Sequence, residues 1–376
     1  MTVSPKSLQD YEKFLYGCRF CPMCKPAGET ANVTYYESHT TRARAMLLWR
    51  VLHGMADYSD RDIELLYETT LDSVSEAWCV NHYPVSKYLL AARQALVKAG
   101  RIPDSVKVVL GQKEALVTES VGKGDTVFVG ADTDQTGLRD ATPRYRRVME
   151  RLGIEGRLLI GSVGLVSHCL GDDMGAAAAA EPMAAEINSS QPKRIVADSQ
   201  DTYYVLTRLF PEWGIPLPKG AEVLSLADYC GKKEKRAGGR DLEGKKVFVH
   251  DSRACVALAE KLPSDEVIQP GFAGPEEALG TGRVYDDLRR IIDRSGGKRV
   301  FSVWSRCMSK TSGADDGLAL TYPALARRLA AYRFQQAEAA GAETVVTDSL
   351  AAVTLWETLS PDEGQGLSFA WWPELL

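Results

Sequence analysis

The chain lacks three features that would assign it to a membrane, nucleic-acid-binding or secreted class. Its 376 residues contain no apolar stretch of the roughly 18 to 20 residues that a membrane-spanning helix requires, and "LLIGSVGLV" is broken by glycines. Lysine and arginine (45) do not outnumber aspartate and glutamate (50), so the net charge of −5 offers no basic surface for nucleic acid. The N-terminal "MTVSPKSLQDYEKFLYG" has no apolar signal-peptide core. We therefore expect a cytoplasmic protein without a membrane span or a nucleic-acid partner.

Cysteine is scarce, with eight residues in the chain, but three of the eight stand close together in "GCRFCPMCKPAGE". In a reducing compartment, clustered cysteines are more often metal ligands than disulfides. A C-x2-C-x2-C loop supplies three thiolates of a 4Fe-4S cluster, and a distant cysteine completes the set. Gly28 stands where a further cysteine of the loop would serve a second cluster, and the N-terminal part has only one other cysteine, Cys79. The pattern predicts one 4Fe-4S cluster held by Cys18, Cys21, Cys24 and Cys79.

Two other interpretations of these cysteines remain open. Structural zinc could take the same four thiolates, although zinc sites are usually built from two C-x2-C pairs. The thiols could also carry no metal, and Cys79 in particular could be a small core residue beside a helix.

The rest of the chain contains an internal repeat. Three pairs of segments match in the same order: "TVFVGADTDQTGL" (126–138) with "KVFVHDSRACVAL" (246–258), "GLVSHCLGDD" (164–173) with "SVWSRCMSKT" (302–311), and "RIVADSQDTYYVLTRLFP" (194–211) with "ETVVTDSLAAVTLWETLSP" (343–361). Their offset grows from 120 to 138 to 150 residues, which loop insertions such as "QPGFAGPEEALGTG" in the second copy would explain. Three ordered matches favour duplication over coincidence.

Each copy is predicted to alternate strands and helices. "VFVGA", "VFVHD", "RIVAD" and "TVVTD" are short buried-strand patterns, while "PRYRRVMERLG" and "YPALARRLAAYRFQQAEAAG" have helical spacing and end at glycine. Such alternation indicates parallel α/β layers. "TTRARAMLLWRVLHGM" and "YPVSKYLLAARQALVKAG", by contrast, are typical of a helical segment. We therefore predict an α/β protein with a small helical domain (1–104) and two α/β modules (105–240 and 241–376), which meet in "GKKEKRAGGRDLEGKK".

The cysteine run, the helical segment and the tandem modules together resemble the cysteine-rich CCG-domain iron–sulfur proteins. This family includes the B and D subunits of heterodisulfide reductase and the iron–sulfur subunits of glycerol-3-phosphate, glycolate and lactate dehydrogenases. The resemblance covers nearly the whole chain. It implies a helical ferredoxin-like domain followed by two CCG-type modules related by a pseudo-twofold axis.

Most of the family's ligand positions in the two modules hold other residues here. The family carries a cysteine after the first strand, a Cys-Cys-Gly turn and a later C-x2-C, which hold non-cubane clusters in heterodisulfide reductase. The replacements are Ala131, His168, Ser199 and Thr202 in the first copy and Arg253, Arg306, Ser349 and Ala352 in the second. Cys169 and Cys307 remain, Cys255 lies two residues from its expected position, and Tyr83-Pro84 replaces the Cys-Pro of the second ferredoxin run. Serine, alanine and arginine cannot replace soft thiolates, so we expect no cluster in these degenerate modules.

The resemblance implies a non-catalytic electron-transfer subunit of an oxidoreductase complex. Such a subunit would relay single electrons through its 4Fe-4S cluster between a flavoprotein dehydrogenase or demethylase, which carries the flavin, and a further carrier. In one alternative the chain is a catalytic subunit that binds a small ligand in the altered CCG cleft, lined by His168, Cys169, Arg306 and Cys307 with His250 and Asp251 nearby. In another, the cluster only stabilises the fold, and the residues of the cleft are buried relics of lost cluster sites.

Overall fold

The N-terminal part of the protein is helical. The computed structural model describes residues 7–18, 21–71, 73–112, 116–131, 141–232, 242–261, 275–363 and 366–375. We call residues 7–112 the helical region. Its elements are η1 (Leu8–Tyr11), α1 (Glu12–Cys18), α2 (Glu29–Thr34), η2 (Glu37–His39), α3 (Thr41–Leu52), α4 (Asp60–Tyr67), α5 (Ser73–Trp78), α6 (Val85–Lys98) and α7 (Asp104–Leu110). Side-chain caps mark where two of these helices begin: the Thr40 hydroxyl accepts from the backbone N–H of Ala43 at α3, and Ser59 forms a capping box with Asp62 at α4.

Residues 116–232, the first repeat, form a five-stranded sheet with the order β1-β3-β2-β4-β5. Its strands are β1 (Val117–Val121), β2 (Thr126–Gly130), β3 (Gly156–Ile160), β4 (Arg194–Ala197) and β5 (Glu222–Ser225), and β1 alone runs antiparallel to its neighbour. The helices are α8 (Thr142–Leu152), α9 (Leu165–Cys169), α10 (Asp173–Ser190), α11 (Gln200–Tyr204), the π-helical η4 (Val205–Leu209), α12 (Phe210–Glu212) and α13 (Leu226–Lys232).

Residues 242–375, the second repeat, form a four-stranded parallel sheet with the order β7-β6-β8-β9. Its strands are β6 (Lys246–His250), β7 (Lys298–Arg299), β8 (Thr344–Thr347) and β9 (Ser368–Trp371). The helices are α14 (Ala254–Ala257), η6 (Glu276–Leu279), α15 (Arg283–Arg294), η7 (Arg306–Met308), η8 (Asp315–Gly317), α16 (Leu318–Thr321), α17 (Pro323–Ala339), α18 (Leu350–Glu363) and η9 (Trp372–Leu375).

The two sheets confirm the predicted α/β architecture and the internal repeat. The order β3-β2-β4-β5 of the first sheet is reproduced as β7-β6-β8-β9 in the second. The growing offset between the repeats has two sources. In the second repeat, residues 251–282 connect β6 to α15, whereas the shorter segment 131–141 connects β2 to α8 in the first repeat. Residues 308–322 then connect Cys307 to α17, whereas only residues 170–172 connect Cys169 to α10. The predicted helices at 142–152 and 323–339 both exist but are not equivalent, since α8 lies between β2 and β3 whereas α17 lies between β7 and β8, the position of α10 in the first repeat.

The helical region and the two repeats share their cores. Successive residues of a strand point to opposite faces of a sheet. Val127 and Val129 of β2 therefore pack toward α10, η4 and the buried residues of the helical region in one continuous cluster, whereas Phe128 packs toward α8 and α13. That second cluster continues into the second repeat through Val247 and Val249. Burial across all three regions thus stabilises them as one unit.

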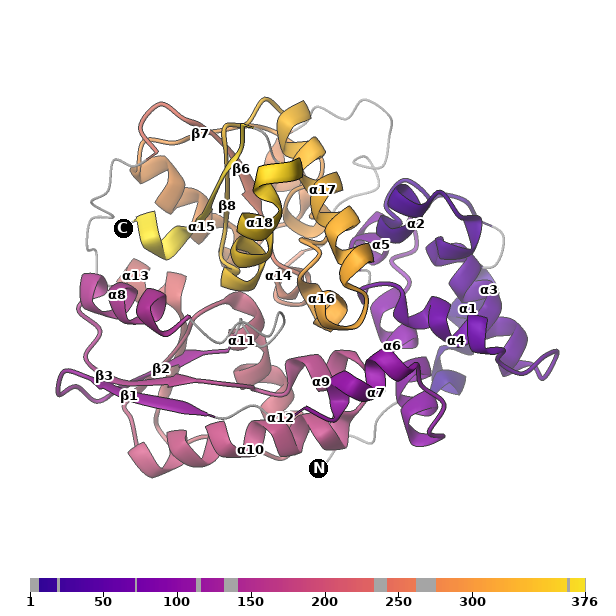
Figure 1. Cartoon of the computed structure of the whole chain (residues 1–376), viewed down its shortest axis with the longest axis horizontal. Coiled ribbons are helices and arrows are strands. Elements are labelled where there is room, and N and C mark those ends of the chain that lie inside the picture. The colour runs from indigo at the N-terminus through magenta and orange to yellow at the C-terminus, as the bar shows by residue number, and fades with distance from the viewer. Residues whose placement is uncertain are drawn as a thin grey trace.

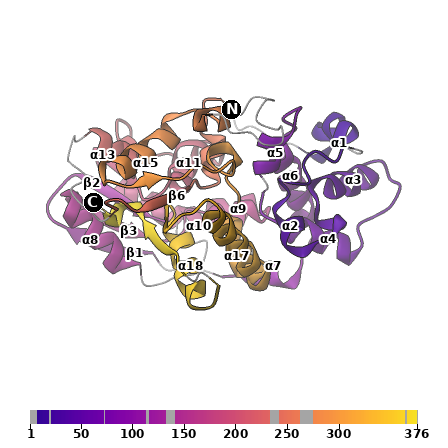
Figure 2. The same ribbon diagram turned by 90° about the horizontal axis from the view of Figure 1, so that it is seen from above.

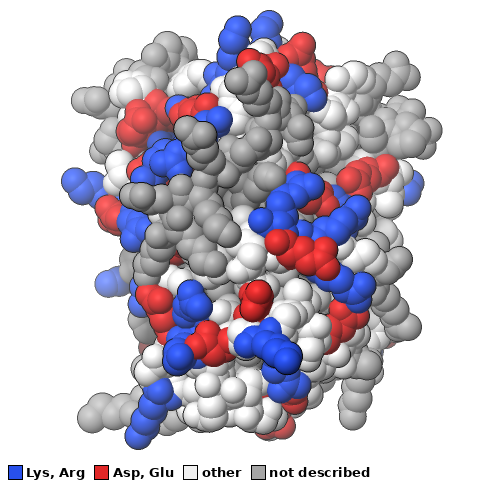
Figure 3. All heavy atoms as spheres, turned by 90° about the vertical axis from the view of Figure 1, so that its left-hand side faces the viewer, with Lys and Arg blue, Asp and Glu red and all other residues white. Residues whose placement is uncertain are grey.

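The helical region lies at one end of the molecule, beside both sheets. Figure 1 shows it on the right, with the second sheet above the first on the left, and Figure 2 places it at the same end. On the face in Figure 3, described Lys and Arg side chains lie beside Asp and Glu side chains. In the described parts of the chain, no helix is both long and apolar enough to cross a membrane.

Candidate functional site

The predicted cysteine ligands begin at the end of α1. Cys18 is the last residue of this helix and is buried, Cys21 is exposed, and Cys24 is buried. The chain turns sharply after Cys24, because its carbonyl accepts hydrogen bonds from the backbone N–H groups of Ala27 (3.1 Å) and Gly28 (2.9 Å). Gly28 then precedes the first residue of α2, so the position where a second cluster's ligand was considered is a helix start.

Cys79 lies against this cysteine loop (residues 18–28). It directly follows α5, and the indole N–H of its neighbour Trp78 donates to the carbonyl oxygen of Met23 over 2.9 Å. Met23 in turn directly precedes Cys24. The hydrogen bond therefore joins the neighbours of two predicted ligands that are 55 residues apart in the chain. Cys79 itself is partly exposed.

The pKa of the Cys18 thiol depends on two of the other predicted ligands. The pKa of Cys18 is raised to about 11, chiefly by burial and then by the charges of Cys79 and Cys21, while the Tyr88 hydroxyl and Arg42 act in the opposite direction. Cys18, Cys21 and Cys79 thus lie within one electrostatic environment.

The four cysteines are the right type of ligand for a thiolate-bound metal centre and lie in one part of the fold, but their side chains are not arranged to hold a metal ion. Across the described ranges, no three His, Cys, Asp or Glu side chains converge closely enough to hold a metal ion. The exposed position of Cys21 is one reason, since its sulfur would have to turn inward to join Cys18 and Cys24. Residues 19 and 20, which connect Cys18 to Cys21, lie outside the described part.

The predicted cleft residues of the first repeat face two different neighbours. The imidazole of His168 donates from Nδ1 to Asp173 over 2.7 Å and packs against the ring of Trp213. Cys169 is fully buried and lies 3.8 Å from the Nη2 of Arg253 in the second repeat. Burial raises the pKa of Cys169 well above the usual value for a thiol, and the charge of Asp316 adds to the effect. This thiol is inert in the folded protein.

The side chains of Arg306 and Cys307 in the second repeat also contact different partners. Arg306 has a left-handed backbone (φ 54°), and its side chain donates to the carbonyl oxygen of Gly280 (3.1 Å) and to Asp286 (3.0 Å). Cys307 lies 3.1 Å from the hydroxyl of Tyr285, which donates to the Cys255 carbonyl. No hydrogen bond or ion pair found among the described residues joins His168 or Cys169 to Arg306 or Cys307. That these four residues line one cleft stays a prediction.

The positions of the family's C-x2-C have become helix caps. The hydroxyl of Ser199 accepts from the backbone N–H of Thr202 (3.1 Å) at the start of α11, and that of Ser349 accepts from the N–H of Ala352 (3.0 Å) at α18. A serine followed three residues later by a capped N–H is the usual N-cap arrangement. These positions now stabilise helix ends.

Arg253, at the position of the second module's first cysteine, ties the three regions together. Its Nε lies 2.6 Å from Asp316, and its Nη2 lies 4.0 Å from Asp201 of the first repeat. Asp316 in turn accepts a hydrogen bond from the backbone N–H of Leu71 in the helical region (2.7 Å). The guanidinium and both carboxylates are almost fully buried. We call Arg253, Asp201, Asp316 and Asp348 the junction network.

The acidic members of the junction network are strongly perturbed by burial. Burial raises the pKa of Asp201 to about 8, with Arg253 opposing the rise and the charges of Asp315, Asp348 and Asp316 adding to it. Burial raises the pKa of Asp348 to about 6, opposed by the backbone N–H of Gln200, which donates to it over 3.0 Å.

Sequence reasoning missed the junction network, for which the sequence carries only a partial signal. Asp-Ser follows three parallel strands: Asp198-Ser199 after β4, Asp251-Ser252 after β6 and Asp348-Ser349 after β8. The carboxyl ends of parallel strands are where α/β proteins gather functional groups. Of these three aspartates only Asp348 belongs to the network, because Asp251 pairs with Arg289 and Asp198 accepts from the hydroxyl of Tyr145.

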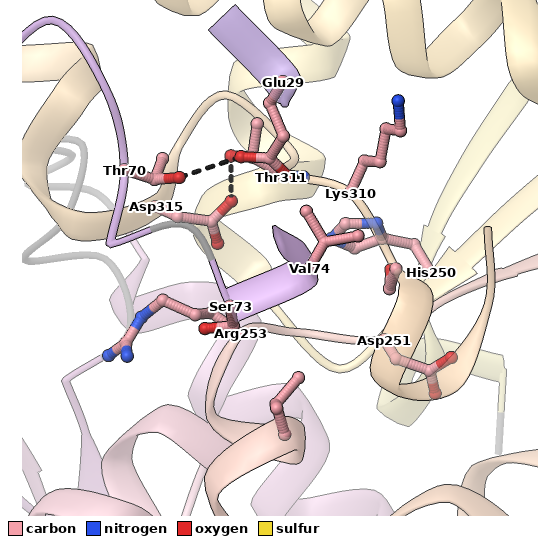
Figure 4. A pocket seen from close by; sticks show the side chains of 12 residues that line it. Glu29, Thr70, Ser73, Val74, His250, Asp251, Arg253, Lys310, Thr311 and Asp315 are labelled. Atoms are coloured by element: carbon pink, nitrogen blue, oxygen red, sulfur yellow. Dashed lines mark hydrogen bonds between the residues drawn. The ribbon is translucent and has the colours of Figure 1, made fainter. Parts of the chain in front are cut away.

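A small pocket lies beside this network, between the helical region and the second repeat. It contains about 300 Å³ of empty space, part of it open to solvent, and Figure 4 shows Glu29, Thr70, Ser73 and Val74 facing His250 and Asp315 across it. His250 Nδ1 accepts from Arg333 (3.1 Å), so its proton is on Nε2, which has no hydrogen-bond partner among the described residues. Burial and then Arg333 lower the pKa of His250 well below its usual value, so the ring is neutral.

Comparison with known proteins supports the fold alone. No protein-family model and no curated protein matches this sequence. The structure is similar to the crystal structure of a hypothetical protein from Helicobacter pylori, with a TM-score of 0.56 and 11% sequence identity over 98% of this chain and 74% of that chain.

Proposed function

We propose that this chain is an iron–sulfur electron-transfer subunit of an oxidoreductase complex in the cytoplasm. It relays single electrons through one 4Fe-4S cluster, held by Cys18, Cys21, Cys24 and Cys79, between a flavoprotein dehydrogenase or demethylase and a further carrier. The proposal keeps the resemblance to the CCG-domain proteins as its basis for the kind of partner. The flavin belongs to that partner and not to this chain.

One observation carries the proposal: the hydrogen bond from Trp78 to the carbonyl of Met23. It holds the segment of Cys79 against the C-x2-C-x2-C loop, as a closing fourth ligand requires. Both ends of the bond directly precede a predicted ligand, so the bond joins the chain segments that carry Cys24 and Cys79. The effect of Cys79 and Cys21 on the pKa of Cys18 is consistent with this arrangement.

Each protein group at this site has a definite role in the proposal. A 4Fe-4S cluster, when bound, supplies one-electron transfer. Cys18 and Cys24 supply thiolates from the buried side of the loop, while Cys21 supplies one from the solvent side. Arg42 lowers the cost of a thiolate at Cys18 through its positive charge. A site open to solvent on one side allows a partner protein to approach closely enough for electron transfer.

Rapid mixing tests the proposal. The chain is purified anaerobically together with its partner, the partner's flavin is reduced with substrate, and the visible absorbance of the cluster is followed. We expect the absorbance to bleach within the turnover time of the partner, and the Cys21→Ala variant to lose this transfer while the partner still binds its substrate. A cluster that stays oxidised while the flavin turns over would contradict the relay and favour a purely structural cluster.

The alternative of a catalytic cleft has narrower support. His168, Cys169, Arg306 and Cys307 face separate neighbours. The pocket at His250, whose buried Nε2–H has no hydrogen-bond partner among the described residues, offers a donor to a small ligand. A ligand bound there in the purified complex would favour this second function.

A further inference from the structure

The second repeat contacts the cysteine loop and its neighbours through the segment around Cys307, and the connection from Cys307 to the next long helix is longer than in the first repeat. The turn at Cys307 is followed by residues 308–322, whereas three residues follow Cys169 before the next helix. Trp304 lies just before this extra segment and Lys310 and Thr311 lie within it. Together they reach the part of the helical region that holds the predicted cluster ligands. We call residues 304–311 the clamp segment.

Lys310 makes the most direct contact with the cysteine loop. Its Nζ donates to the carbonyl oxygen of Pro26 over 2.8 Å, and Pro26 is two residues beyond Cys24. The ammonium group also lies 4.0 Å from the ring centroid of Trp304 and 5.1 Å from that of Tyr332. The residue is only 2% exposed. A lysine is rarely buried so completely, because the loss of hydration is costly, so these contacts hold its charge in place beside the loop.

Two further contacts fix the clamp segment on the same loop. The rings of Trp304 and Trp78 stack with centroids 5.3 Å apart, and Trp78 donates to Met23 inside the loop. The backbone N–H of Thr311 donates to Glu29, the first residue of α2 after the loop. Figure 4 shows Glu29 and Thr311 facing each other across the boundary between the two regions. The clamp segment therefore contacts the loop itself at Pro26, and it also contacts Trp78, which donates to the loop, and Glu29, which directly follows the loop.

We propose that Lys310 is a positioning residue for the cysteine loop: it holds the loop in the conformation that its thiols need, and its charge favours the more negative, reduced state of the bound cluster. The inference rests on the proposed function for its second part only. A repeat that has lost its own cluster ligands would thus serve the cluster of the neighbouring region. A positive charge held in a buried site acts strongly, because little solvent screens it.

Alkylation of the metal-free full chain tests the positioning role without any cluster. Wild type and Lys310→Met are treated with iodoacetamide, and peptide mass spectrometry follows Cys24. We expect the variant to expose Cys24 about tenfold faster, because the loop opens locally once its anchor is gone. Lys310→Arg should restore protection, and Lys107→Met, at an exposed lysine on α7, should change nothing. Unchanged Cys24 alkylation in Lys310→Met would overturn the positioning role.

The reduction potential tests the charge. In iron-loaded protein, Lys310→Met should lower the potential relative to wild type, while Lys310→Arg should leave it close to wild type. Greater mobility of the loop alone would not lower the potential in Lys310→Met while leaving it close to wild type in Lys310→Arg. An equal potential in all three proteins would overturn the electrostatic part. Wild type that takes up no iron would instead refute the proposed function, and the alkylation result would still decide the positioning role.

Discussion

The helical region and the two repeats differ in how far their cysteines reach solvent. Cys21 is exposed and Cys79 is partly exposed, although Cys18 and Cys24 are buried. Cys169 and Cys307 are fully buried, and their thiols lie beside Arg253 and Tyr285. We expect the first group to bind metal and the second to contribute to packing.

The positions that the family resemblance assigns to ligands in the repeats hold buried charges and helix caps. Arg253 joins Asp201 and Asp316 where a cysteine is expected from the resemblance, and serines at the expected C-x2-C positions cap two helices. The comparison therefore makes two claims: the repeats are stable without metal, and metal binds only in the helical region. The predictions below test these claims in order of decreasing effect.

The largest effect is expected from breaking the junction network. Arg253→Met leaves the buried carboxylate of Asp316 without its cation, so we expect a loss of about 3 to 5 kcal/mol in the free energy of unfolding. Arg283→Met is the matched control, because Arg283 is two-thirds exposed and pairs with Asp228 at the surface, where about 0 to 1 kcal/mol is expected. Urea unfolding measures both. A loss at Arg253 no larger than at Arg283 would show that the network does not support the junction.

The next effect concerns pH. Because burial raises the pKa of Asp201 to about 8, the folded protein binds this proton more tightly than the unfolded chain does. Its contribution to stability is therefore greatest below about pH 4 and is lost as the pH rises toward 8. Asp201→Asn removes this loss, so we expect it to gain about 2 to 4 kcal/mol relative to wild type between pH 5 and pH 8.

Unfolding titrations at several pH values measure this difference. Asp104→Asn, at an exposed aspartate, should leave the change in the free energy of unfolding with pH the same as in wild type over this range. Parallel pH profiles of wild type and Asp201→Asn would contradict the assignment.

Thiol labelling sharpens the comparison of the two groups of cysteines. Burial raises the pKa of Cys307 to about 11, although the hydroxyl of Tyr285 opposes the rise. In metal-free folded protein we expect Cys307 to react roughly a hundredfold more slowly than Cys21, because the reactive species is the exposed thiolate. Peptide mass spectrometry after timed alkylation gives both rates, and denatured protein supplies the reference. Equal rates in the folded protein would remove the distinction.

The smallest effect is expected at a former ligand position. Ser199→Ala removes the cap of α11 and should lower stability by about 1 kcal/mol. Ser189, whose hydroxyl bonds within the last turn of α10 at an exposed site, is the control, and its change to Ala should have little effect. If Ser199→Ala proved neutral in urea unfolding, the capping role would be wrong.

Local patterns were enough to predict the repeat and most of its elements. Apolar runs located β2, β4, β6 and β8, and helical spacing located α3, α6, α8 and α17. The junction network could not be predicted in the same way, because Arg253, Asp201 and Leu71 are brought together only by the packing of three regions. The burial of Lys310 was equally hidden, since a lysine in a polar loop is normally solvated. The cleft at His168 and Arg306 stays a prediction, since the contacts of these two residues lie within their own repeats.

Metal analysis of anaerobically purified full-length chain tests the central claim most directly. The account predicts about four irons per chain with the absorbance of a single 4Fe-4S centre. It predicts loss of that iron in Cys18→Ala, Cys21→Ala and Cys24→Ala, and full retention in Cys169→Ala and Cys307→Ala. Loss in Cys79→Ala tests the fourth ligand. Zinc in place of iron, or iron that depends on Cys169 or Cys307, would contradict the account.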